Sequence, residues 1–285
     1  MSVGFVILNY NTSKLTRELA IKISSYDMVS NIIIVDNCST DNSFEELNLI
    51  SDKKISVYKT KYNGGYSYGN NLGVNISKKL GNKYTFISNP DVQVCEKTIT
   101  DIIETLEQYD YSLVTCLQYE IDGSLGQPPI LKRNTYLDDL ADCLFLTRKI
   151  SKRINKDIDI TEDIQEISMF RGSFFAVDTD KFIKIGGFDE EVFLYCEERI
   201  LSKKMSLAGM KMAILNFDRY DHMHSMSINI AYQKRYKKIK LQYKSRVLYN
   251  KKYNKVGFLR LIILKLFMNI SLFEYYVMDM LHGGK

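Results

Sequence analysis

Three short segments, far apart in the chain, hold the side chains best suited to metal binding or proton transfer. The first is SNPD, residues 88–91, which places a single carboxylate, Asp91, after the apolar run YTFI. Mg²⁺ and Mn²⁺ favour oxygen ligands and bind through one or two carboxylates plus the phosphate oxygens of a substrate. Asp91 is therefore either a metal ligand or the cap of a helix that begins near Glu96.

The second segment is FLYCEERI, residues 193–200, in which Glu197 and Glu198 are adjacent. A helix dipole favours acidic side chains in the first turn, and this alone would explain the pair. However, Phe193, Leu194 and Tyr195 come just before it, and apolar surroundings raise the pKa of a carboxyl group toward the range of a general base. The pair is thus either a helix start or a catalytic site.

The third segment is YDHMHS, residues 220–225, which contains two of the three histidines of the chain. His222 and His224 would share one face of a strand but diverge in a turn or helix, so we expect only one of them to reach a site. His222 is a candidate for a further metal or phosphate contact. The histidine pair alone does not indicate zinc, and the five cysteines are scattered without a CxxC pair, which fits a protein of the reducing cytosol.

The elements that position these residues follow from the pattern of apolar runs. In the first half of the chain such runs alternate with amphipathic stretches, which predicts βαβ units and a doubly wound parallel sheet. With 285 residues and 45% hydrophobic content, the chain can form one large α/β domain. The MSVGFVILNY start lacks the basic region of a signal peptide and is expected to be the first strand. The predicted strands are 3–8, 32–35, 55–58, 84–87 and 174–177, and the predicted helices are 13–25, from about 42, 66–79, 96–108 and 195–207.

Polar residues follow each of the first four strands, at the sheet edge where doubly wound folds bind ligands. Asp36 could accept hydrogen bonds from a pyrimidine or a ribose, or it could only form an Asx turn with Asn37. Likewise, NGGYSYGNNLG, residues 63–73, is either a ligand contact or a flexible helix start. Neither GxGxxG nor a P-loop follows a strand, so the phosphates of a nucleotide would need a divalent cation, with Asp91 as its best ligand.

Seven segments in this order resemble the family 2 glycosyltransferases, and within them the rhamnosyltransferase-like branch, over residues 3–227. They are VILNYN, IIIVDNCSTD, NGGYSYGNNLG, ISNPDV, RGSFFAV, GGFDEEVFLYCEE and DHMHS. The resemblance implies a GT-A fold, with a mostly parallel central sheet flanked by helices. It also implies a UDP- or dTDP-linked sugar donor, an Mn²⁺ or Mg²⁺ cofactor, and inverting transfer of rhamnose or another hexose to a lipid-linked oligosaccharide of a surface polysaccharide.

The resemblance also assigns site residues. Asp91 and His222 would hold the metal, and Glu197 and Glu198 would form the catalytic pair, with Glu198 as the base. The residues implied for the nucleotide-sugar site are Asn9, Asn11, Asp36, Asn37, Gly65, Asn70 and Asn89.

The chain departs from the family pattern at four positions. Asn89 replaces the first acid of the common Asp-x-Asp, Glu198 and Ile200 stand where the family usually has Asp, and Lys204 stands where it often has Arg. These changes leave open an alternative function, a noncatalytic nucleotide-sugar-binding scaffold of the same fold. A sugar nucleotidyltransferase would need a glycine- and arginine-rich loop where residues 9–11 read Asn-Tyr-Asn.

We divide the chain into a GT-A domain, residues 1–227, and a helical tail, residues 228–285. Within the domain we distinguish a nucleotide-binding half (1–122), a variable insertion (123–166) and an acceptor and catalytic half (167–227). The insertion contains Pro128 and Pro129 and has little periodicity. It either lies near the site or is only surface decoration.

The tail carries the positive charge of the protein. Residues 222–273 contain twelve Lys and Arg and no Asp or Glu, although the net charge of the whole chain is only +5. We expect the tail to bind an anionic membrane surface, which would place the protein on the cytoplasmic face of the cell membrane, or else to form a helical cap or homodimer contact. No nucleic-acid-binding module surrounds it. We expect no membrane crossing, because polar residues interrupt every apolar run of about 20 residues: Arg260, Lys265, Asn269 and Glu274.

Overall fold

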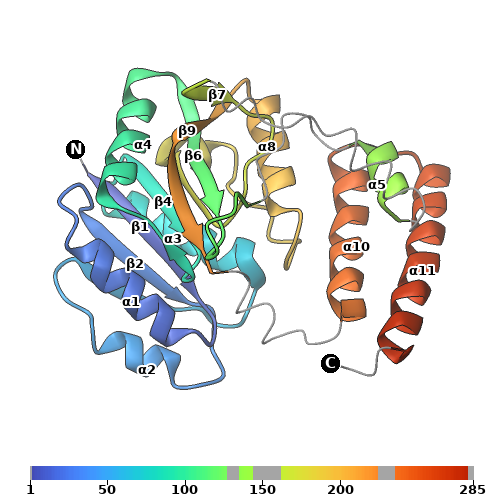
Figure 1. Cartoon of the computed structure of the whole chain (residues 1–285), viewed down its shortest axis with the longest axis horizontal. Coiled ribbons are helices and arrows are strands. Elements are labelled where there is room, and N and C mark those ends of the chain that lie inside the picture. Colours follow the sequence, from blue (N-terminus) through green and yellow to red (C-terminus); the bar gives the residue numbers. More distant parts are fainter. Residues whose placement is uncertain (1, 127–134, 144–161, 224–234, 282–285) are drawn as a thin grey trace.

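The computed structural model describes residues 2–126, 135–143, 162–223 and 235–281. A nine-stranded sheet forms the centre of the molecule, with strand order β3-β2-β1-β4-β8-β6-β9-β5, and β7 pairs with β9. Helices lie on both faces of this sheet, and two long C-terminal helices, α10 and α11, stand beside it (Figure 1).

The first half of the chain forms the predicted βαβ units. Strands β1 (Val3–Asn9), β2 (Asn31–Asp36), β3 (Ile55–Lys59) and β4 (Tyr84–Ser88) run parallel. They alternate with α1 (Ser13–Ser24), α2 (Ser43–Asn48), α3 (Gly65–Lys79) and α4 (Glu96–Gln108). Each predicted element appears within one or two residues of its expected bounds. This parallel half therefore follows directly from the alternation of apolar runs.

The second half makes the sheet mixed. Strand β8 (Phe174–Asp178) is antiparallel to both β4 and β6 (Tyr111–Tyr119), and β6 is parallel to β9 (Lys211–His222). Two short strands, β5 (Val92–Gln93) and β7 (Ile164–Glu166), are antiparallel to β9. The sequence pattern predicts neither β6 nor β9. Residues 216–218 of β9 bulge out of the pairing with β6, between Cys116 and Leu117. This bulge interrupts the alternation of apolar and polar residues by which a strand is predicted.

The two faces of the sheet are covered by separate apolar clusters. On one face Phe5, Phe86 and Phe174 lie ring to ring beneath α1 and α4. On the other face, residues of α3, α7 (Thr179–Lys184) and α8 (Glu197–Leu207) pack together, including Val74 and Leu201. Burial of such surface stabilises the fold by about 25 cal/mol per Å². These layers hold the strand ends in place.

Helix α8 begins at Glu197, two residues later than predicted. Tyr195 and Cys196 have φ values of 68° and 70°, which is the left-handed region rather than the helical one. The chain therefore turns sharply just before the acidic pair, so that Glu197 and Glu198 occupy the first turn of α8.

The insertion is more than surface decoration. It contains β7 and α5 (Tyr136–Cys143), and α5 packs with α10 (Arg235–Lys252) and α11 (Phe258–Leu281) around Leu264 and Met268. Pro128 and Pro129 lie outside the described residues. The domain boundaries proposed from the sequence stay a prediction.

The helical C-terminal extension is confirmed, and α11 is one continuous helix. The four polar residues named above do not exclude a membrane crossing by composition, and the expectation of no crossing stays a prediction. Within the described residues, Phe258–Met280 is the one stretch long and apolar enough to cross a membrane, judged by length and composition alone.

Candidate active site

The ends of β1 and β2 form the first part of the site. Asn9 and Asp36 are neighbours in the parallel register, and both side chains are fully buried. Asn9 Nδ2 donates to Asp36 Oδ1 over 2.8 Å, and its Oδ1 accepts from Thr12 and Thr16. The hydroxyl and backbone N–H of Ser39 also donate to Asp36. The amide of Asn9 is thus used within the protein, and it positions Asp36 rather than facing open solvent.

Asn37 connects this edge to the start of α3. Its Nδ2 donates to Asn63 Oδ1 over 3.1 Å and to the carbonyl of Gly65 over 3.0 Å. Asn11 lies further out, on the rim. It adopts a φ of 56°, and its side chain bonds to Thr40.

Gly65 brings α3 against the loop that carries the catalytic pair. Its φ is +83°, and a Cβ at this position would lie 1.9 Å from the carbonyl oxygen of Phe193. The N–H of Tyr66 donates to that same oxygen over 3.0 Å. Only glycine fits here. Asn70, one turn further along, is fully buried, and its Oδ1 has no hydrogen-bond partner among the described residues.

The segment Arg171–Ser173, which leads into β8, is where the predicted parts of the site meet. Gly172 N donates to Glu198 Oε1 over 3.2 Å, and a Cβ at 172 would lie 2.6 Å from that atom. On the other side, Asn89 N donates to the carbonyl of Ser173 over 2.9 Å. The catalytic pair and the SNPD turn therefore lie on either side of one short segment.

Three residues of this centre were not predicted as site residues. Tyr66 donates its hydroxyl to the carbonyl of Gly172 over 2.5 Å, and burial, with Glu198 nearby, raises the pKa of Tyr66 well above its ordinary value. Burial lowers the pKa of Arg171, although the charge of Glu198 opposes that shift. Gln118 accepts from Ser173 and Tyr220. The RGS sequence directly before an apolar strand was the available signal for Arg171.

The two acids of the pair have different surroundings. Glu197 is almost fully buried, and this burial, followed by repulsion from Glu198, raises the pKa of Glu197 well above its ordinary value. Glu198 is half-buried and faces Gly172. The burial of Glu197 therefore favours its protonated form.

The C-terminal helices hold the loop that leads into α8. Ser245 of α10 donates its hydroxyl to the carbonyl of Leu194 over 2.8 Å, and Tyr249 packs with Val192 and Ile200. Consecutive left-handed residues such as Tyr195 and Cys196 cost free energy and persist only where the surroundings fix them. The tail is therefore part of the framework of the candidate site.

Asp91 and His222 lie side by side, and their assignment to a metal stays a prediction. His222 Nε2 is 3.2 Å from Asp91 Oδ1, and both side chains are buried. The antiparallel pairing of Val92 with His222 brings them together. Two ligand atoms at right angles around Mn²⁺ or Mg²⁺, each about 2.1 Å away, lie roughly 3 Å apart. The geometry fits a cation that these two side chains hold from one side.

Other ligands would have to complete the coordination shell of such a cation. The described part of the chain contains no group of three or more His, Cys, Asp or Glu side chains that could hold a metal. Oxygens of a bound diphosphate, or water, suit the remaining positions. His224, the other candidate of the pair, lies outside the described residues.

The arrangement of the strands is that of the GT-A fold. The sequence profile of the family described as "Glycosyl transferase family 2" matches residues 5–185, and the chain belongs to this family. Rhamnosyltransferase WbbL of Escherichia coli (strain K12) is 26% identical over 153 residues, which cover 52% of this chain and 56% of WbbL. The low-salt glycan biosynthesis hexosyltransferase Agl10 of Haloferax volcanii is 23% identical over 197 residues, which cover 69% and 59%. The chain thus spans less than two thirds of either relative.

Solved structures support the same fold. The mannosyltransferase PcManGT of Pyrobaculum calidifontis, solved with GDP-Man and Mn²⁺, aligns over 99% of this chain and 76% of its own, with a TM-score of 0.60 and 12% identity. S. aureus TarS 1-349 with UDP-GlcNAc aligns over 87% and 67%, with a TM-score of 0.57 and 16% identity. At these identities the likeness establishes the fold alone.

Proposed function

We propose that the protein is an inverting glycosyltransferase, which moves rhamnose or another hexose from a UDP- or dTDP-linked donor to a hydroxyl of a growing oligosaccharide. The observation that carries this proposal is the contact between Gly172 and Glu198, next to the contact between Ser173 and Asn89. It puts a carboxylate beside the turn where the donor diphosphate would lie. Family membership supports the same reaction.

Donor binding would use the edge formed by the first strands. Asp36 accepts three hydrogen bonds from Asn9 and Ser39, and an ionised carboxylate has about four acceptor positions. One acceptor position on Asp36 thus remains for the base or the ribose, although the side chain is fully buried in this structure. The assignment of Asn11, Asn70 and Asn89 to the donor stays a prediction.

The chemical step would rest on Glu198. The acceptor hydroxyl gives its proton to the Glu198 carboxylate, and its oxygen forms a bond to the anomeric carbon from the face opposite the diphosphate. The bond between that carbon and the diphosphate oxygen breaks, and the nucleoside diphosphate leaves with the electron pair. This route needs one base and no protein nucleophile.

Asp91 and His222 are the residues that would hold Mn²⁺ or Mg²⁺. The bound ion would supply charge stabilisation for the departing diphosphate. The remaining work of this chain is to orient the acceptor hydroxyl toward Glu198, which the fixed backbone of residues 171–173 would help to do.

The acceptor and the location belong to the same proposal. A lipid-linked oligosaccharide of a surface polysaccharide would be presented at the cytoplasmic face of the cell membrane, and the basic tail suits an anionic leaflet there. WbbL and Agl10 are named for rhamnosyl and hexosyl transfer, which supports a hexose donor.

Donor binding and turnover test the proposal separately. We expect one of the UDP-, dTDP- or GDP-sugars to raise the melting temperature, and to do so more with Mn²⁺ than without it. Free nucleoside diphosphate should then appear only when an acceptor saccharide is supplied. Stabilisation without release under any acceptor would favour the noncatalytic scaffold, and the absence of any metal-dependent stabilisation would contradict the proposal.

A further inference from the structure

Helix α11 has two apolar faces, and the described residues pack against only one of them. Leu264 and Met268 are buried against α5 and α10, and Tyr275 is buried beneath Arg235 of α10. Other apolar residues recur at helical spacing and point outward, with exposed fractions of 43% to 75%. We call these the outer face of α11: Leu259, Ile262, Ile263, Leu266, Ile270 and Phe273.

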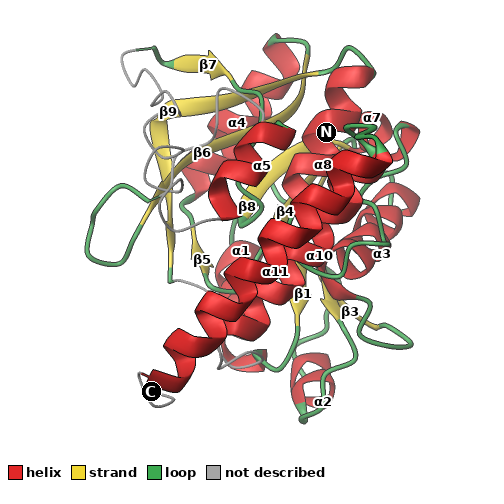
Figure 2. Cartoon of the chain, turned by 90° about the vertical axis from the view of Figure 1, so that its right-hand side faces the viewer, coloured by secondary structure: helices red, strands yellow, loops and turns green. Residues whose placement is uncertain are grey.

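The outer face lies on the outside of the molecule. Figure 2 shows α11 in front of α10, on the side that turns away from the sheet in Figure 1. The helix has 24 residues and is therefore about 36 Å long. An exposed apolar stripe of this length marks an interaction surface.

The packing of α10 favours α11 lying along a membrane over crossing it. The two helices run antiparallel, since Tyr243 hydroxyl bonds to Ser271 and Tyr236 N donates to Asp279. A crossing α11 would take α10 with it, and α10 carries exposed lysines, among them Lys240 and Lys244. Lysines in the hydrocarbon core are costly, whereas a helix in the interface keeps them in water.

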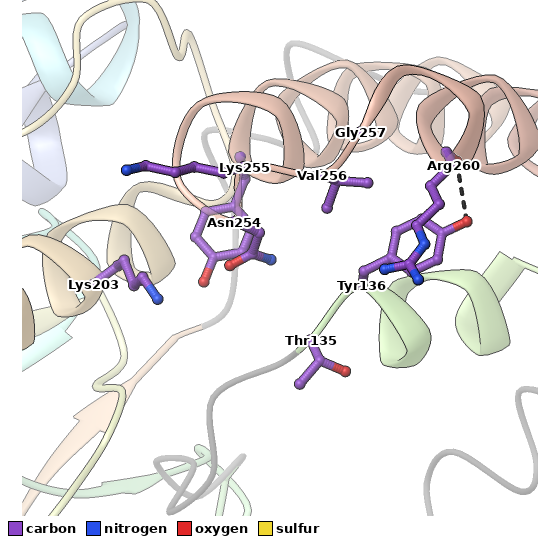
Figure 3. Close-up of a pocket in the computed structure, with 9 residues that line it drawn as sticks. Thr135, Tyr136, Lys203, Asn254, Lys255, Val256, Gly257 and Arg260 are labelled. Atoms are coloured by element: carbon purple, nitrogen blue, oxygen red, sulfur yellow. Dashed lines mark hydrogen bonds between the residues drawn. The ribbon is translucent and has the colours of Figure 1, made fainter.

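A cationic pocket lies at the N-terminal end of the outer face. It has a volume of about 410 Å³, and its walls include Lys203 of α8, Lys255 and Arg260, together with Tyr136 and Asn254 (Figure 3). No acidic side chain among the described residues pairs with Lys203, Lys255 or Arg260.

The pocket differs in this respect from its surroundings. Lys252, a few residues before it, pairs with Asp189 and Glu191, and Arg246 lies within ion-pair distance of Asp139 and Asp142. Within the described part of the chain, Lys203, Lys255 and Arg260 thus have no acidic partner, as suits a pocket for an anionic ligand.

We propose that the outer face of α11 lies in the plane of an anionic leaflet, and that the pocket binds the phosphate of a lipid headgroup there. This membrane orientation would turn the site toward a lipid-linked acceptor, and in that respect it rests on the proposed function. Apolar residues would enter the acyl region, while Lys203, Lys255 and Arg260 would meet phosphate at the headgroup level. A second copy of the chain is a poorer partner, because it would bring the same cations, Lys203, Lys255 and Arg260, to the contact.

Vesicle flotation of the full chain tests both parts of the proposal. The wild type should float with vesicles that contain phosphatidylglycerol and much less with phosphatidylcholine alone. Leu266→Gln with Phe273→Gln should abolish flotation on both. Lys203→Gln with Arg260→Gln should weaken binding to anionic vesicles roughly 30-fold, since each cation near such a surface contributes about 1 kcal/mol. Lys53→Gln with Lys79→Gln, two exposed lysines of the sheet domain, is the charge-matched control and should bind like the wild type.

Four results would overturn the proposal. The first is failure of the wild type to bind either vesicle, and the second is equal binding by the pocket variant and its control. Resistance to carbonate extraction would show that α11 crosses the membrane. A wild-type dimer that Leu266→Gln and Phe273→Gln render monomeric, without loss of flotation, would assign the outer face to self-association. Flotation needs neither donor nor acceptor, so its outcome is independent of the test of glycosyl transfer.

Discussion

Arg199 and Asp139 form a bidentate ion pair that joins the candidate catalytic helix to the insertion. Arg199 Nη1 and Nη2 each lie 2.9 Å from an oxygen of Asp139, whose side chain is fully buried. Asn250 Nδ2 of α10 donates to the same carboxylate over 2.6 Å, and the guanidinium lies 4.4 Å from the ring centre of Tyr249. Arg199 directly follows Glu198, so the insertion and α10 together fix the start of α8.

Breaking this pair should destabilise the protein strongly. Asp139→Asn leaves the buried guanidinium of Arg199 without its carboxylate, which costs about 3–5 kcal/mol. Arg199→Met should cost less, because Asp139 keeps Asn250 and the more distant Arg246, at 3.7 Å. The double variant should lose less than the sum of the two, because neither charge is then left behind. Urea unfolding measures all three. Glu166→Gln, which breaks the exposed pair with Lys211, is the control and should cost less than about 1 kcal/mol; an equally small loss at Asp139 would contradict the assignment.

Glu198→Gln should lower kcat roughly 10²- to 10⁴-fold, the usual contribution of a general base. Donor binding, followed by thermal shift, should not change, because the Gln side chain has nearly the same shape. Glu198→Asp restores the acid that the family usually has here and should keep measurable activity. Full turnover by the Gln variant would remove Glu198 from the mechanism.

Glu197→Gln should change how stability depends on pH. The folded pKa of Glu197 is raised by burial and by Glu198, so the native state holds the proton more tightly than the unfolded chain does. Its stabilising contribution is therefore complete below the ordinary pKa of 4.5 and is lost as the pH rises through the raised value. Relative to the wild type, the Gln variant should be more stable at alkaline than at acidic pH in denaturant unfolding. A difference that is the same at both ends, or that also appears in the exposed control Glu104→Gln, would contradict this.

Asp91→Asn and His222→Ala should each remove most of the Mn²⁺-dependent part of donor stabilisation, because these side chains face one another at 3.2 Å. The thermal shift with donor alone, in the presence of EDTA, should change little. Asp27→Asn alters an exposed carboxylate and provides the matched control. Wild-type metal dependence in both site variants would place the cation elsewhere.

Gly65→Ala should be far more damaging than Gly81→Ala, although both glycines have a φ near +80°. The strain of a left-handed alanine costs about 1–2 kcal/mol at either position. At Gly81 a Cβ meets nothing within 4 Å, whereas at Gly65 it would lie 1.9 Å from Phe193 O and displace the loop before α8. Denaturant unfolding gives the difference, and activity should fall with it only at Gly65. Equal losses would show that strain alone matters.

The sequence by itself determined the parallel half of the sheet and the chemistry at its edge. Alternating apolar runs and amphipathic stretches are local signals, so β1 to β4 and their helices were predictable, as was the pairing of polar residues with strand ends. The order of the seven segments was enough to indicate the family. The acidic pair and the SNPD turn were also predictable as candidate site residues, because a carboxylate in apolar surroundings is costly unless it has a partner or a function.

Only the tertiary structure decided what these residues touch. Strand β8 enters the sheet antiparallel between β4 and β6, and this places residues 171–173 between Asn89 and Glu198. Asn89 and Ser173 are more than 80 positions apart, and no local pattern encodes their contact. The partner of Arg199, Asp139, was likewise not predictable, because its segment has little periodicity. Nor was the left-handed turn at Tyr195 and Cys196, which makes α8 begin two residues later than the sequence pattern predicts. Long-range pairing and packing override local propensity at these points, since burial of the two apolar faces of the sheet fixes how the chain returns.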